Sequence, residues 1–128
     1  MKTTFDYTGG LETFQRAYKV CALWSTNDES NESGDQPLDL KFDVEDIAPG
    51  SAAVMDAECA AFVAGNLDLL TDWDAAQAGH DFWLTRNRHG AGFWDRGHSE
   101  NGEALTRAAH AAGERDLYVG DDRQVWQS

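Results

Sequence analysis

The chain has 128 residues, of which 23 are acidic and 10 basic; its formal net charge of -13 disfavours direct binding to nucleic acid, since such surfaces neutralise phosphates with clustered Lys and Arg. The length accommodates one hydrophobic core rather than two, so a single domain spanning residues 1–128 is expected. A hydrophobic share of 41%, with five Trp and six Phe, excludes wholesale disorder.

The first part of the chain predicts two helices separated by a loop and a strand. Residues 11–24 place apolar side chains at helical spacing after a pair of glycines. Residues 25–37 are polar, acidic and rich in turn formers, which predicts a solvated loop. Apolar and charged residues alternate over residues 38–44, the period of a half-buried strand. The Ala-rich run 49–70 opens with a proline and predicts the longest helix.

The second part of the chain predicts two more helices and two pairs of strands. Residues 73–78 read as a short helix that Gly79 stops. The pattern over residues 82–94 is extended with a turn in its middle, which predicts a hairpin. An apolar stripe over residues 99–112, followed by a glycine, predicts a further helix. Residues 116–127 have the form of two short strands around a turn.

Helices and antiparallel strands therefore alternate irregularly along the chain. This order favours an α+β fold, in which a small antiparallel sheet of about three to five strands packs with three to four helices. The N-terminal MKTTFDYTGG lacks the apolar region of a signal peptide, and no stretch approaches a membrane-spanning length, so a cytoplasmic location is expected. Cys21 and Cys59 lie in apolar helical contexts and are predicted to be buried free thiols.

No metal or cofactor is expected. The histidines of the chain are too irregularly spaced for a zinc motif such as HExxH, and no pair of cysteines accompanies them. The acidic runs do not keep the ligand order of a calcium loop. The GAG sequence at Gly90 lacks the surroundings of a nucleotide-binding glycine motif.

Residues 80–97 hold an unusual density of reactive and binding side chains, with two His, two Asp, three Arg and two Trp. One interpretation is a ligand site, in which Arg orients an anionic substrate and His moves a proton. Asp81 or Asp95 with His89 would then form the acid–base pair, although no nucleophilic Ser or Cys motif lies nearby. The other interpretation is structural, with aromatic core anchors and Arg–Asp pairs that hold the hairpin. The candidate residues are His80, Asp81, Trp83, Arg86, Asn87, His89, Trp94, Asp95 and Arg96.

Acidic residues concentrate in the predicted loops and at the ends of elements. Such a run is either a solvated face or a mimic of the phosphate charges of a nucleic acid, which attracts the basic groove of a partner protein. A mimic needs carboxylates spaced along one surface at roughly the phosphate repeat of ~3.4 Å per strand. The candidate contacts are Asp28, Glu29, Asp39, Asp43, Glu45 and Asp46.

The sequence GHDFWLTRN at Gly79, followed by HGAGFWDR at His89, resembles the hallmark of an uncharacterised family of small proteins encoded by phages, prophages and plasmids. The segments ALWS, PLDL, DIAP, LT and LYVGDD resemble further fixed points of that family; they begin at Ala22, Pro37, Asp46, Leu105 and Leu117. The sequence departs from the pattern at Arg88 and Arg123, where the family favours Gly.

The resemblance implies a genomic setting whose small accessory proteins often blunt host restriction or CRISPR systems, and many such inhibitors are acidic. The leading hypothesis is therefore a non-enzymatic inhibitor of the anti-CRISPR or anti-restriction type. It would act inside the host cell on a nucleic-acid-binding protein or defence complex, and would touch neither nucleic acid nor membrane itself. The alternatives are a small-ligand or catalytic domain built on residues 80–96, and an interaction protein for phage replication or assembly recognised through an exposed aromatic patch.

Overall fold

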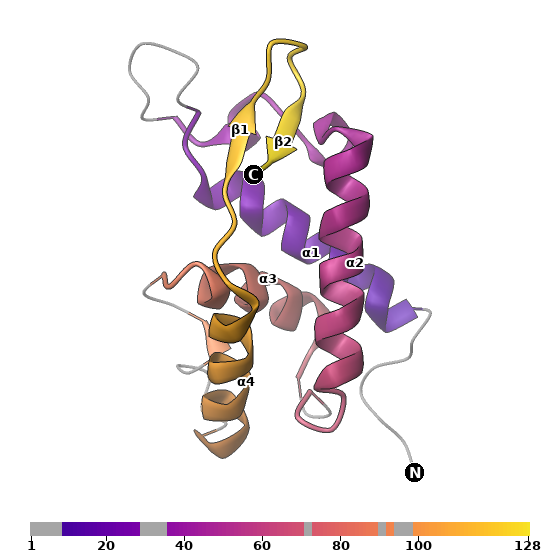
Figure 1. Cartoon of the computed structure of the whole chain (residues 1–128), viewed down its shortest axis with the longest axis vertical. Helices are drawn as coiled ribbons and strands as arrows, with labels where there is room; N and C mark the ends of the chain where they lie inside the picture. The colour runs from indigo at the N-terminus through magenta and orange to yellow at the C-terminus, as the bar shows by residue number, and fades with distance from the viewer. Residues whose placement is uncertain (1–8, 29–35, 71–72, 90–91, 94–98) are drawn as a thin grey trace.

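The computed structural model of the chain describes residues 9–28, 36–70, 73–89, 92–93 and 99–128, which form a mostly helical α+β fold (Figure 1). The helices are α1 (Gly9–Ser25), α2 (Pro49–Gly65), α3 (Ala75–Arg86) and α4 (Ser99–Ala112). Two short strands, β1 (Leu117–Val119) and β2 (Val125–Gln127), pair antiparallel, and the 3-10 turns η1 (Leu38–Leu40) and η2 (Val44–Asp46) connect α1 to α2. No helix in the described ranges is long and apolar enough to cross a membrane.

The aromatic core lies where α1, α2 and α3 meet. Phe62 of α2 stacks on Phe82 of α3, with ring centroids 4.0 Å apart, and Phe82 also packs against Tyr18 of α1 at 5.2 Å. Phe93 extends this cluster, since its ring stacks on Phe62 at 5.8 Å and meets Trp73 edge-on at 5.2 Å. Five buried aromatic rings thus join segments distant in sequence, and their burial is a main source of the stability of the fold.

The hairpin predicted over residues 82–94 is wrong, because its first predicted strand, residues 82–86, is the last part of α3. Asp74 caps the helix, accepting a hydrogen bond of 3.1 Å from the Gln77 backbone N–H. The six residues from Asp81 to Arg86 are all buried, since α3 contacts α1 and α4 and therefore lacks a continuous solvent-facing side. A helix covered in this way carries no 3.6-residue period for sequence reasoning to find.

Gly79 does not stop a helix, as the sequence predicted, but lies inside α3. A Cβ atom at this position would collide with the backbone carbonyl of Phe14 in α1. The glycine therefore permits the close crossing of α1 and α3, which also explains why a helix breaker is tolerated there.

The strand predicted over residues 38–44 is also wrong, because this segment forms η1, a short connection and the first residue of η2. Leu38 and Phe42 are buried, but Leu40 between them is 62% exposed, so the apparent alternation matches no sheet face. Asp43 and Asp46 form a capping box that turns the chain: the Asp43 carboxylate accepts from the Glu45 N–H at 3.0 Å, and the Asp46 carboxylate from the Asp43 N–H at 2.9 Å. The sheet of the described chain accordingly has two strands, not three to five.

The predictions for α1, α4 and the C-terminal pair of strands are confirmed. Strand β2 is anchored on its outer side to the start of α2, where Ala48 N–H donates to the Val125 carbonyl at 2.7 Å and Gln127 N–H to the Ser51 hydroxyl at 2.9 Å. Cys21 and Cys59 are buried free thiols, as expected. Burial raises the pKa of Cys21 to about 12, so its thiolate is scarce and the residue is a poor nucleophile.

Candidate functional site

Arg86, expected to bind a ligand or pair with a nearby Asp, is buried and bound within the fold. Its guanidinium donates to the last carbonyls of α4, with Nε 2.7 Å from the Gly113 oxygen and Nη2 3.0 Å from the Ala112 oxygen. Nη1 donates to Tyr18 Oη at 2.9 Å and Glu58 Oε1 at 3.0 Å. The cation thus caps the negative end of α4 and ties all four helices together. It is not free to orient a substrate.

Glu58 of α2 is shared by two arginines. Besides Arg86, it accepts from Arg115 Nη2 at 2.9 Å and Nε at 3.1 Å, and from the Gln127 amide at 3.4 Å. The Glu58 side chain is 21% exposed, so these charge-assisted bonds are partly shielded from water. The Arg115 guanidinium is consequently held against α2, so its positive charge is directed away from the adjoining pocket.

Three residues of the distinctive segment, Trp83, Asn87 and His89, line an open pocket of about 460 Å³ at the C-terminal end of α3. Trp83 is fixed by a bond of 2.8 Å from its indole N–H to the Ser25 hydroxyl. Asn87 is fixed by a bond of 2.8 Å from the Arg115 backbone N–H. The third residue, His89, is exposed. The sequence analysis named all three residues as candidates but did not predict that they line one pocket.

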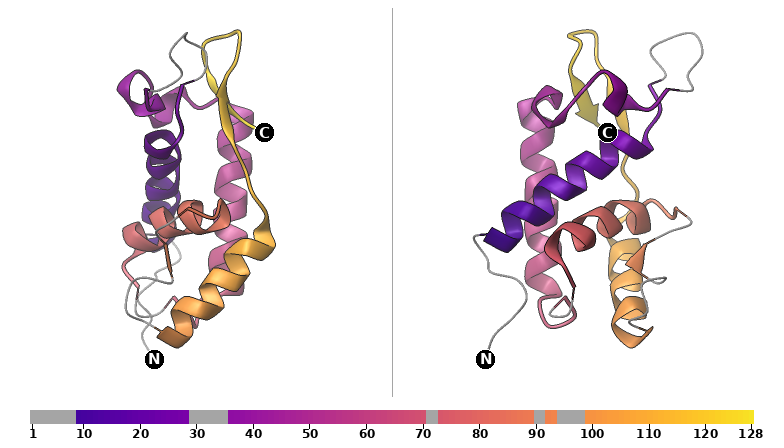
Figure 2. Two further views of the ribbon diagram at one scale, coloured as in Figure 1. Left: turned by 90° about the vertical axis from the view of Figure 1, so that its left-hand side faces the viewer. Right: turned by 180° about the vertical axis from the view of Figure 1, so that it is seen from behind.

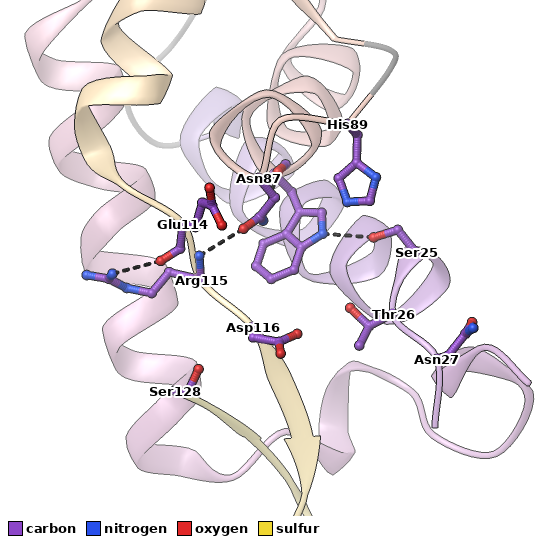
Figure 3. Close-up of a pocket in the computed structure, with 10 residues that line it drawn as sticks. Ser25, Thr26, Asn27, Asn87, His89, Glu114, Arg115, Asp116 and Ser128 are labelled. Atoms are coloured by element: carbon purple, nitrogen blue, oxygen red, sulfur yellow. Dashed lines mark hydrogen bonds between the residues drawn. The ribbon is translucent and has the colours of Figure 1, made fainter. Parts of the chain in front are cut away.

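The pocket is polar and carries two exposed carboxylates, of which Glu114 lies 3.8 Å from Arg88. Figure 3 shows His89, Ser25 and Thr26 on one side and the chain from Glu114 to Asp116 on the other. The Arg115 guanidinium points away toward Glu58, whereas Glu114 and Asp116 are exposed carboxylates at the pocket. Hydroxyl, amide and carboxylate oxygens therefore dominate, an arrangement that accepts hydrogen bonds from a cation.

Asp81 and His89 do not form the suggested acid–base pair. Asp81 is fully buried and accepts from the Gln77 amide at 3.0 Å, while its neighbour His80 lies 3.9 Å away and packs against Trp24. None of the pockets described in the structure is lined by both Asp81 and His89. Trp94, Asp95 and Arg96 lie outside the described residues. Within the described ranges, no group of three or more His, Cys, Asp or Glu side chains could hold a metal ion.

The acidic candidates occupy several environments. Asp28 is buried, at 2% exposure, and Glu29 lies outside the described residues. Asp39 and Glu45 are exposed, and Asp43 and Asp46 form the capping box of η2.

Sequence reasoning missed two further carboxylates, Asp121 and Asp122, in the turn between β1 and β2. This turn packs beside η1 and η2, since the Arg123 guanidinium lies 5.7 Å from the centre of the Phe42 ring. Figure 2 shows the turn and the connection before α2 at the same end of the molecule in both views. We call this region the acidic end; it consists of Asp39, Asp43, Glu45, Asp46, Asp121 and Asp122.

Two residues other than glycine, at positions where the sequence analysis expected Gly, have left-handed backbone, with φ of 59° at Arg88 and 62° at Arg123. Helix α3 ends in a Schellman motif: Arg88 N–H donates to the Thr85 carbonyl at 3.0 Å and His89 N–H to the Leu84 carbonyl at 2.9 Å. Arg88 occupies the position of this motif that glycine usually fills. Both loops therefore have the conformation that the expected Gly would favour.

No family model, curated protein or solved structure matches this chain.

Proposed function

We propose that the chain is a non-enzymatic inhibitor of a host defence system, of the anti-CRISPR or anti-restriction type, whose acidic end occupies the nucleic-acid groove of its target. The observation that carries the proposal is the gathering of six carboxylates from two separate segments at one end of the fold. Electrostatic complementarity of this kind steers association and sets specificity. The resemblance to proteins of phages and plasmids supports the same proposal through association.

The distribution of positive charge supports this choice of surface. In the described part of the chain, every Lys and Arg except Lys41 and Arg123 forms an ion pair with a carboxylate of the same chain. The pairs are Arg16–Glu45, Lys19–Asp56, Arg86–Glu58, Arg88–Glu114, Arg107–Glu103 and Arg115–Glu58. At the acidic end, Arg16 reaches Glu45 at 3.8 Å, but both side chains are mostly exposed and the pair is weak. Six carboxylates there outnumber Arg16, Lys41 and Arg123.

The test is an affinity capture from host lysate at low and high salt, with two variants of equal net charge. The first carries Asp39→Asn, Glu45→Gln and Asp121→Asn, which neutralise the acidic end and leave the carboxylates that cap turns in place. The control carries Glu12→Gln, Asp68→Asn and Glu100→Gln, three exposed sites elsewhere. We expect the native chain and the control to capture a nucleic-acid-binding complex that salt or competing DNA releases, and the first variant to lose it. Equal capture by both variants, or no such partner at either salt, would refute the proposal.

A second candidate function is the binding of a small ligand at the pocket beside α3. It is favoured by the convergence of Trp83, Asn87 and His89 on one polar cavity. His89 is exposed and its side chain can be removed without disturbing the core. If His89→Ala abolishes inhibition while the variant neutralised at the acidic end retains it, the pocket rather than the charged surface carries the function.

A further inference from the structure

Strand β1 offers one edge that no described backbone group occupies. Ser128 N–H donates to the Asp116 carbonyl at 3.0 Å and Gly120 N–H to the Gln124 carbonyl at 2.8 Å. Along an antiparallel ladder, hydrogen-bonded residue pairs alternate with pairs that are not hydrogen-bonded. Tyr118 and Trp126 lie opposite each other, midway between the two bonds just named, and therefore form the hydrogen-bonded pair within the strands. The backbone groups of Leu117 and Val119 therefore point away from β2.

The two outer edges of this small sheet differ. The outer edge of β2 is covered, because Val125 and Gln127 bond to Ala48 and Ser51 at the start of α2. On β1, the Leu117 N–H donates to the side chain of Asp116 at 2.9 Å. Within the described residues, the Leu117 carbonyl and both backbone groups of Val119 have no hydrogen-bond partner. An edge with free donors and acceptors is a template for a further strand.

A groove runs along this free edge. A cavity of about 230 Å³ separates β1 from the chain after α1; its walls are Thr26, Asn27 and Leu38 on one side and residues 116–119 on the other. Thr26, Asn27 and Asp116 also line the larger pocket beside α3, so the two cavities adjoin. An extended chain beside β1 would direct alternate side chains to opposite faces, and one of them would enter that pocket.

We propose that the free edge of β1 binds an extended, basic segment of the target protein as an added strand, with a Lys or Arg side chain seated in the adjoining pocket. The proposal rests on the proposed function, because it names how the target is held beyond the attraction of the acidic end. Backbone bonds to Val119 and Leu117 supply the register. The Asp116 carboxylate selects the cation, and Glu114 adds to it because its exposed pair with Arg88, at 3.8 Å, is weak.

The charge of the pocket decides between possible occupants. Arg115 is the one Lys or Arg among the lining residues, and Glu58 holds its guanidinium away from the cavity. A second copy of this chain would bring its own excess of acidic residues, 23 against 10 basic, toward the same carboxylates. Charge repulsion disfavours the binding of a second copy. A basic segment, in contrast, can form backbone hydrogen bonds with β1 and is attracted by the carboxylates of the pocket.

The experiment uses a blocked hexapeptide alternating Lys or Arg with Val, titrated into the full isotope-labelled chain and followed by NMR. We expect shifts at Val119, Thr26 and Asp116, and hydrogen exchange at the Val119 amide slowed about tenfold in the complex, because that amide gains a hydrogen bond. The same peptide N-methylated along its pairing edge keeps its charge but cannot bond to β1, and we expect its affinity to fall about tenfold. This comparison leaves the protein unaltered.

Protein variants test the charge. Asp116→Asn with Glu114→Gln keeps oxygen acceptors in place and should weaken the native peptide about tenfold, whereas Asp68→Asn with Glu100→Gln should leave its affinity unchanged. No binding at millimolar peptide, shifts elsewhere, or equal affinity for the N-methylated peptide would overturn the edge assignment. A failed capture from lysate alongside specific peptide binding would refute the proposed function but leave the edge intact; retained capture with no peptide binding would do the reverse.

Discussion

Replacing Arg88 with glycine should stabilise the protein. A left-handed backbone costs a residue with a Cβ atom roughly 1–2 kcal/mol, and Arg88 adopts it with φ of 59°. Glycine avoids this cost but loses about 0.4–1 kcal/mol through the greater freedom of the unfolded chain. The net gain relative to alanine at the same position is therefore about 0.8 kcal/mol, within a range of about 0–1.6 kcal/mol, and the central value raises Tm by about 2–4 °C.

The comparison with Arg88→Ala isolates the backbone from the side chain. Both substitutions remove the ion pair between Arg88 and Glu114, whose side chains are 59% and 68% exposed at a distance of 3.8 Å. An exposed pair of this kind contributes little, so Arg88→Ala should stay within about 0.5 kcal/mol of the native chain. Thermal unfolding followed by circular dichroism measures both variants. If Arg88→Gly melts no higher than Arg88→Ala, the Cβ atom is not strained there and the reasoning is wrong.

Three further predictions concern the core. Arg86→Met should destabilise the fold by about 3–5 kcal/mol, measured by denaturant unfolding, because it leaves the Ala112 and Gly113 carbonyls without their buried donor. Of its two arginines, Glu58 then keeps only Arg115. A loss below about 1 kcal/mol would contradict the bridging role. Gly79→Ala should cost about 1–3 kcal/mol in the same assay through the clash with Phe14, whereas Gly65→Ala, where a Cβ meets open space, should not destabilise. The folded-state pKa of Cys21 is raised by burial from 9.0 to about 12, so the neutral thiol stabilises the fold below pH 9 and that contribution is lost as pH rises toward 12. Native Cys21 should accordingly resist alkylation at pH 8 until denaturant is added; rapid labelling of the folded chain would show that the site is open.

Much of the fold could be predicted wherever the signal was local. The apolar stripe of α4 predicted which face of the helix is buried, and the glycine after it predicted where the helix ends. That glycine, Gly113, has a left-handed φ of 84°. The hairpin at the C-terminus followed from a turn between two short apolar runs. Burial of the two cysteines followed from their neighbours in sequence. Each of these features needs a few adjacent residues and one exposed side, which a periodic pattern records.

The candidate sites could be predicted only in part. The segment from His80 to Arg96 was recognised as unusual, and Trp83, Asn87 and His89 do line one pocket. Its interpretation depended on contacts that spacing does not record, since Arg86 turns out to serve Ala112 and Gly113, residues more than 25 positions away. The acidic residues before α2 were recognised as candidates. Their proximity to Asp121 and Asp122, in the turn between β1 and β2, was not predicted.

The sequence by itself determined the helical stripes, the C-terminal hairpin, the charge and the glycine-favouring turns, because each depends on neighbours along the chain. Tertiary structure alone decided that residues 75–86 form a helix, since burial of Asp81 to Arg86 erases the contrast between an inner and an outer face. It also decided that Arg86 is a structural cation and that one edge of β1 stays open. Those outcomes depend on which distant segments compete for the same space and hydrogen bonds, a matter that local spacing does not encode.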